Sequence, residues 1–122
     1  MIANTGTQTR EITVLRSVLI ERLAWQPVQG CPGVSVKVIS RDADIVAALI
    51  AYRPQASTPG RPHPADQYIW VVSGEVCIAG RWLDAGSGAH IPAGVAHPAF
   101  AGSRNGCLIL QLHGAGGTHP LQ

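Results

Sequence analysis

The chain has 122 residues, of which 46% are hydrophobic and 13% charged, and its formal net charge is only +2. This length suits one domain, and the near-neutral charge, spread along the chain, excludes the basic surface that nucleic-acid binding requires. The first ten residues lack the apolar segment of a secretory signal, and the longest apolar run, Ile45–Tyr52, is too short to cross a bilayer. We therefore expect one cytoplasmic domain with neither nucleic acid nor membrane as a partner. Its three cysteines form no CxxC pair and are expected as reduced, buried thiols.

The first half of the chain predicts an edge element followed by a hairpin. Residues 12–23 mix apolar and charged side chains without clean alternation, and we predict an edge strand and a short turn there. After a segment rich in Pro and Gly, residues 34–40 alternate apolar and polar side chains with a period of two, which indicates a strand. A turn at 41–44 then leads to a second strand over 45–52. The two strands together predict a hairpin.

The second half predicts a loop and then a meander of short strands. Four prolines over residues 53–64 exclude a regular helix or central strand. Residues 67–73 are β-branched and aromatic and form a strand expected to stop at Gly74, with two further short strands separated by Gly80. Residues 107–113 predict the last strand and 114–122 a loose tail. Trp70 and Trp82 are expected as core or dimer contacts.

Residues 86–101 carry a spaced pattern of turn residues and histidine: Gly86, Pro92, Gly94 and His97. Pro92 and Gly94 form a rigid turn that would present His97 at a fixed place. The pattern resembles the second signature motif of the cupin superfamily, in which Gly, Pro, Gly and His occur at these intervals and a final Asn follows. That Asn is replaced by Ala101 here.

Residues 59–74 resemble the first cupin motif, which contains two histidines, a glutamate and a glycine. His63 and Gly74 match it, whereas Arg61 stands where the first His is expected and Gln67 where the Glu is expected. The resemblance implies an all-β fold, a small antiparallel double-stranded β-helix or jelly-roll barrel. It also implies a single cupin domain over 1–122, with a barrel core at about 25–113, an N-terminal strand arm at 10–24 and a flexible tail at 114–122.

A closer likeness is to the cupin domain of ChrR-type anti-sigma factors and to acetylacetone dioxygenase-like cupins. It rests on Trp25, on Pro32–Val34, on Leu49–Pro54 and on the Gly106–Cys107 pair. ChrR-type proteins also carry an N-terminal zinc-binding helical domain that holds the sigma factor. No counterpart to that domain is found in this sequence, so an anti-sigma role is not expected. Cupins commonly form homodimers through a sheet edge near the N-terminus, and residues 12–19 are the expected edge.

The matched motif positions define a candidate metal site. His63 and Gln67 lie four residues apart, which places both on one face of an extended segment, and Arg61 shares that face. The resemblance implies His63, Gln67 and His97 as ligands of a divalent ion, and imidazole with an amide oxygen suits Fe, Mn, Ni or Zn. The competing interpretation of each histidine alone is an ordinary barrel or loop residue. Arg61 either binds the carboxylate or phosphate of a small-molecule ligand or is a surface arginine.

Other polar residues are open alternatives. Asp66 is an oxygen donor whose odd spacing from His63 points it to the other face, His90 depends on strand register, and Gln111 and His113 share one face of the last strand. Two functional hypotheses follow. The first is a metal-binding cupin acting on a small organic molecule, with dioxygenase chemistry implied by the resemblance. The alternative is a non-catalytic module with a degenerate metal site that binds or senses an anionic metabolite.

Overall fold

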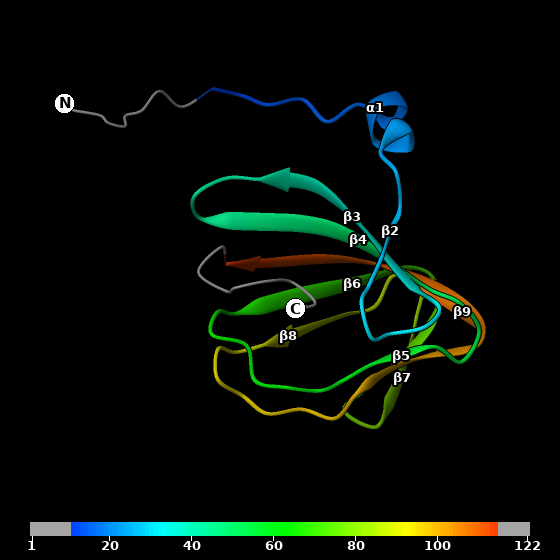
Figure 1. Ribbon diagram of the computed structural model, residues 1–122. Coiled ribbons are helices and arrows are strands. Elements are labelled where there is room, and N and C mark those ends of the chain that lie inside the picture. The colour runs from blue at the N-terminus through cyan, green and yellow to red at the C-terminus, as the bar shows by residue number, and fades with distance from the viewer. Residues whose placement is uncertain (1–10, 115–122) are drawn as a thin grey trace.

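The computed structural model describes residues 11–114, which form a single antiparallel sheet that folds over as a small barrel (Figure 1). The strands are β2 (Gln26–Pro27), β3 (Val34–Arg41), β4 (Ile45–Tyr52), β5 (Ser57–Thr58), β6 (Gln67–Ile78), β7 (Arg81–Asp84), β8 (Gly88–Ile91) and β9 (Phe100–Gly114). Their order is β2-β3-β4-β9-β6-β7, with β5 paired to β9 and β8 to β6. The predicted all-β class is confirmed. Within residues 11–114, no helix has the length and apolar character that crossing a bilayer requires.

The β3–β4 hairpin is confirmed, and its alternation builds one wall of the core. Along β4 every second side chain is buried, from Val46 to Tyr52, because successive side chains of a strand point to opposite faces. The turn is held by Asp42, whose Oδ1 accepts backbone hydrogen bonds from Asp44 (2.7 Å) and Ile45 (2.8 Å). The core consists of Val28, Cys31, Val34, Ile50, Tyr52, Ile69, Val71, Val76, Ile78, Ile91, Phe100, Cys107 and Ile109.

Gly74 does not end its strand, which corrects the sequence-based boundary. Strand β6 continues through it to Ile78, and its pairing with β9 changes register just after Gly74. Gly74 has φ +74°, and a Cβ built there would overlap the carbonyl oxygen of Gly106. A β-bulge with close backbone approach uses glycine in the same way as a turn does, so composition alone did not distinguish the two. β9 likewise begins at Phe100, before the predicted start of the last strand.

The N-terminal arm is helical, which corrects the predicted edge strand. α1 (Ser17–Arg22) is a single short helix without a buried residue, and Figure 1 shows it outside the sheet. Its contact with the barrel passes through Lys37, whose Nζ donates to the Ile20 carbonyl (3.2 Å) and lies 4.7 Å from the ring centre of Trp25. The pairing with β3 begins only after the arm, over the two residues of β2, so no strand pairing holds the arm in an extended conformation.

Two further expectations concern exposure and the tail. Trp70 and Trp82 have 45% and 57% of their surface exposed, so neither is a core residue. Their role as dimer contacts stays a prediction. The predicted loose tail lies outside the described residues, except for Gly114, which is the last residue of β9. Residue 10 of the predicted arm also lies outside them.

Candidate functional site

The interior of the barrel is polar at one end of strands β6 and β9. Gln67 on β6 pairs with His113 on β9, and the next inward positions pair Ile69 with Gln111. Gln67, Gln111 and His113 are 6%, 1% and 3% exposed, so three polar side chains lie within the barrel wall. Burying such groups costs free energy unless they find partners, which makes this end a candidate site.

His63 joins this polar end from the loop before β6. Its ring centre lies 5.1 Å from that of His113, with the two planes at 74°. His63 Nδ1 lies 3.1 Å from the carbonyl oxygen and 3.2 Å from the backbone nitrogen of Ala65. The His63 carbonyl accepts a hydrogen bond from Gly94 (2.8 Å), which ties this loop to the turn of the second motif.

Two buried atoms of the site have no hydrogen-bond partner, His63 Nε2 and Gln67 Oε1. When His63 Nδ1–H donates to the Ala65 carbonyl, the neutral ring keeps a lone pair on Nε2. Both orphaned atoms then offer lone pairs. Leaving a buried polar atom unsatisfied costs about 1–3 kcal/mol. A cation or a hydrogen-bond donor from a ligand would remove that cost.

His97 lies apart from this pair. It is half-buried, its Nδ1 donates to the Pro98 carbonyl (2.8 Å), and its ring stacks on Phe100 at 4.8 Å. Its backbone abuts Gly60, where a Cβ would overlap the His97 carbonyl. Because Nδ1 donates, the neutral ring presents its lone pair at Nε2. The contacts described for His97 do not include His63 or Gln67, and within residues 11–114 no three His, Cys, Asp or Glu side chains gather in a metal-binding arrangement.

Arg61 is exposed and follows Gly60, the residue in backbone contact with His97. Its guanidinium therefore does not enter the closed interior occupied by Gln67. In the sequence it lies between Gly60, which contacts the His97 backbone, and His63. This position is compatible with binding the charged end of a ligand from outside.

Asp66 and His90 lie on the outer face, away from the site. Asp66 Oδ2 lies 3.0 Å from His90 Nε2, and Asp66 Oδ1 accepts the backbone N–H of Ala93 (2.8 Å). The hydrogen bond from His90, then that from Ala93, lowers the pKa of Asp66. His90 also stacks on Tyr68, with ring centres 4.5 Å apart. Asp66 thus points away from His63, as its odd spacing predicted, and the register of β8 turns His90 outward.

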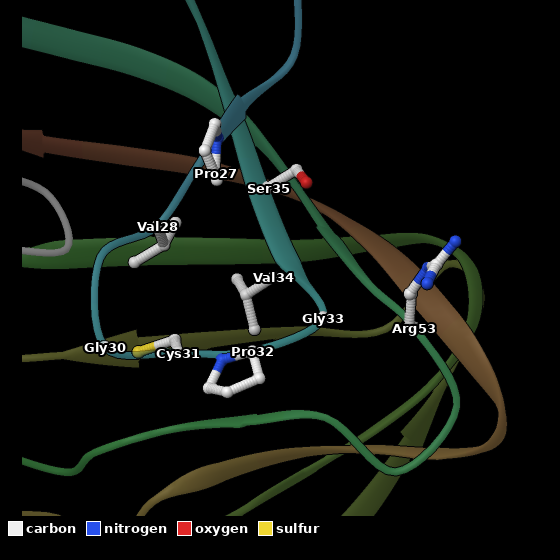
Figure 2. A pocket seen from close by; sticks show the side chains of 9 residues that line it. All are labelled: Pro27, Val28, Gly30, Cys31, Pro32, Gly33, Val34, Ser35 and Arg53. Carbon is white, nitrogen blue, oxygen red and sulfur yellow. The ribbon is translucent and has the colours of Figure 1, made fainter.

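A cavity of about 450 Å³ lies at the opposite end of the barrel. Figure 2 shows its lining residues, Pro27, Val28, Gly30, Cys31, Pro32, Gly33, Val34, Ser35 and Arg53. Val34 pairs with Tyr52, whereas His113 pairs with Val46, six positions farther along β4. At about 3.3 Å a residue, the cavity and the polar site are roughly 20 Å apart. Its lining is mostly small and apolar, with Arg53 the single charged side chain, so it is not the place for the motif chemistry.

The sequence of residues 14–116 matches the family described as the ChrR cupin-like domain. The chain belongs to this cupin family. The predicted likeness to ChrR-type cupins is thereby confirmed, and residues 59–74 and 86–101 both fall inside the matched region. No curated protein sequence matches the chain.

Solved structures share the cupin fold at low sequence identity. KdgF from Halomonas sp. superposes with a TM-score of 0.69 at 24% identity, covering 77% of this chain and 87% of that one. An acetylacetone dioxygenase from Acinetobacter johnsonii gives 0.69 at 11%, covering 89% and 76%. The anti-sigma factor ChrR of Rhodobacter sphaeroides, solved in complex with SigE, gives 0.66 at 18%, covering 76% and 49%. These likenesses show the jelly-roll fold of this cupin.

Two residues of the polar end, Gln111 and His113, had no assigned role in the sequence-based site. Their spacing of two on a predicted strand indicated that they share a face. Which face was inward depended on the pairing of β9 with β6, which the cupin motifs do not state. The register places both inside, beside Gln67 and His63.

Proposed function

We propose that this cupin binds a divalent metal ion, Fe, Mn, Ni or Zn, through His63, Gln67 and His97, and acts on a small organic molecule. The observation that carries the proposal is the pair of orphaned buried atoms, His63 Nε2 and Gln67 Oε1. The residues present fit a cation, because imidazole nitrogen and amide oxygen are both neutral donors with available lone pairs. His97, with Nδ1 held by Pro98, has the tautomer in which a neutral histidine ligates through Nε2.

The residues around such a metal ion would have different roles. His63 and His97 each have Nδ1 next to a backbone carbonyl, an arrangement that orients a ligating ring. Arg61, which is exposed and lies two residues before His63, would bind a carboxylate or phosphate of the substrate. Iron held there would supply the open coordination positions at which a dioxygenase brings substrate and dioxygen together.

Elemental analysis tests the proposal, using protein purified without an affinity tag or chelator. We expect near-stoichiometric metal in the wild type and its loss in His63→Ala and His97→Ala, with His90→Ala as the control because His90 faces outward. Iron would direct the substrate search to oxygenases, and zinc, nickel or manganese to isomerases and lyases. Protein that takes up no metal, even after reconstitution, would overturn the proposal.

A second candidate function is a non-catalytic module that binds an anionic metabolite through Arg61. It is favoured by the ligand set itself, since within the described residues no three His, Cys, Asp or Glu side chains cluster. The double variant Arg61→His with Gln67→Glu separates the two candidates. A sharply raised zinc affinity, together with no native activity in the wild type, would favour the binding module.

A cytoplasmic homodimer is part of the same proposal. The support is the exposed apolar side chains of the arm, Leu15, Val18 and Leu19, together with Trp70 and Val72 on the outer face of β6. Light scattering of the purified chain tests it. We expect a dimer, and a Leu19→Glu variant that stays dimeric would exclude the arm from the contact.

A further inference from the structure

His113 lies inside the barrel at the position that completes the polar site. It is 3% exposed, it is the direct cross-strand partner of Gln67, and its ring is edge-to-face with that of His63. A buried histidine in contact with another histidine is a feature of metal sites as well as of hydrogen-bonded cores. The neighbouring orphaned atoms of His63 and Gln67 distinguish this site from a satisfied core.

The first cupin motif lacks an imidazole in this chain, because Arg61 stands at its first histidine position and is exposed. A site left with His63, Gln67 and His97 has one neutral donor fewer than the pattern it resembles. The barrel interior contains one further described imidazole next to Gln67, that of His113.

We propose that His113 replaces the missing histidine as a metal ligand, so that it joins His63, Gln67 and His97 in binding the ion and does so from the barrel interior. This inference rests on the proposed function, since it assigns a ligand to the same metal. A histidine of the last strand would then take the role of the loop histidine that Arg61 replaces.

The spacing of the two rings agrees with a shared ion. When two imidazole nitrogens each lie about 2.1 Å from one ion at a roughly tetrahedral angle, their ring centres are about 5 Å apart. The observed separation of His63 and His113 is 5.1 Å. The two rings are therefore as far apart as two ligands of one ion would be.

Gln111 serves as the positioning residue for His113. Its side-chain nitrogen lies 3.5 Å from His113 Nδ1, and it is itself 1% exposed. An amide can present either its NH₂ group or its oxygen, so Gln111 can also accept from Nδ1–H, which is the tautomer in which a neutral ring has its lone pair on Nε2. A partner on the second ring nitrogen is usual for histidines that ligate metals.

The test is zinc affinity measured by competition with a chromophoric chelator, on the untagged full chain. Loss of an outer-shell partner typically lowers metal affinity about 10–100-fold. Loss of a direct ligand should exceed that range, so we expect His113→Ala to lower zinc affinity by more than about 100-fold. His113→Gln, which keeps a polar side chain and is the variant to use if the alanine fails to fold, should also bind zinc more weakly. His90→Ala is the matched control and should bind as the wild type does.

Histidine NMR gives an independent readout that does not depend on activity. Zinc should shift the ring resonances of His63 and His113 and leave those of His90 in place. If the wild type binds zinc and both His113 variants bind it equally well, the inference about His113 is wrong while the metal site stands. If the wild type binds no zinc at all, both the proposed function and this inference are overturned.

Discussion

Gln67 and Gln111 form a natural pair for testing whether the polar end is built for a ligand. Both are glutamines buried within one sheet, but Gln67 Oε1 has no partner, whereas the Gln111 amide contacts His113. Methionine has nearly the same length as glutamine and removes the amide. Since an unsatisfied buried group costs about 1–3 kcal/mol, Gln67→Met should stabilise the metal-free protein by about 1 kcal/mol. Gln111→Met removes a made contact and should destabilise it by about 1 kcal/mol.

The assay is urea denaturation with chelator present, supported by thermal melts in which about 1 kcal/mol corresponds to roughly 4 °C in a domain of this size. With added zinc, Gln67→Met should become less stable than the wild type. Ligand at about 100 times Kd stabilises the folded state by about 2.7 kcal/mol, and Gln67→Met should lose most of that gain. A Gln67→Met protein destabilised as much as Gln111→Met would refute the reasoning, because Gln67 would then be a satisfied core residue.

Three further predictions concern the scaffold. Gly74→Ala should cost about 1–3 kcal/mol more than Gly80→Ala in urea denaturation, since both have positive φ but only the Cβ at 74 would overlap backbone; equal costs would contradict the bulge. Two backbone hydrogen bonds lower the pKa of Asp42 from 3.8, so its contribution is present at neutral pH and lost as pH falls through that lowered value. At pH 7 the melting temperature of Asp42→Ala should therefore be lower than that of the wild type and lower than that of Asp42→Asn. The difference between Asp42→Ala and the wild type should shrink in acid, and a difference that does not change with pH would refute this role of Asp42. The Tyr52 hydroxyl lies 2.9 Å from Thr58 Oγ1. Tyr52→Phe and Thr58→Val should therefore each lower the free energy of unfolding by about 1–3 kcal/mol, and the double variant should lose less than the sum of the two. Fully additive losses would show that the two side chains are not coupled.

Local patterns predicted most of the barrel. The period of two over residues 34–40 and 45–52 located the hairpin, because one face of each strand must be apolar when the other faces solvent or a second layer. The two failures share a cause. Gly74 marks a bulge instead of a strand end, and Ser17–Arg22 is a helix instead of an edge strand. In both places the local conformation depends on whether a neighbouring strand pairs with the segment, which the local sequence does not show.

The residues of the candidate site were likewise predicted only in part. Motif spacing selected His63 and Gln67, whose buried Nε2 and Oε1 atoms have no hydrogen-bond partner, while His97 shows no described contact with either. Motif spacing did not select His113. That residue lies fifty positions after His63 and matches no signature, so only spatial contact relates the two.

By itself, the sequence determined the strand-rich cupin fold, the family and the loop that carries His63, since these depend on side-chain alternation, turn residues and short-range spacing. Only the tertiary structure decided which polar side chains face one another. The antiparallel register of β6 against β9 sets Gln67 opposite His113, and a shift of one residue would turn His113 out to the other face. Register is a property of two strands together, and neither strand contains it alone.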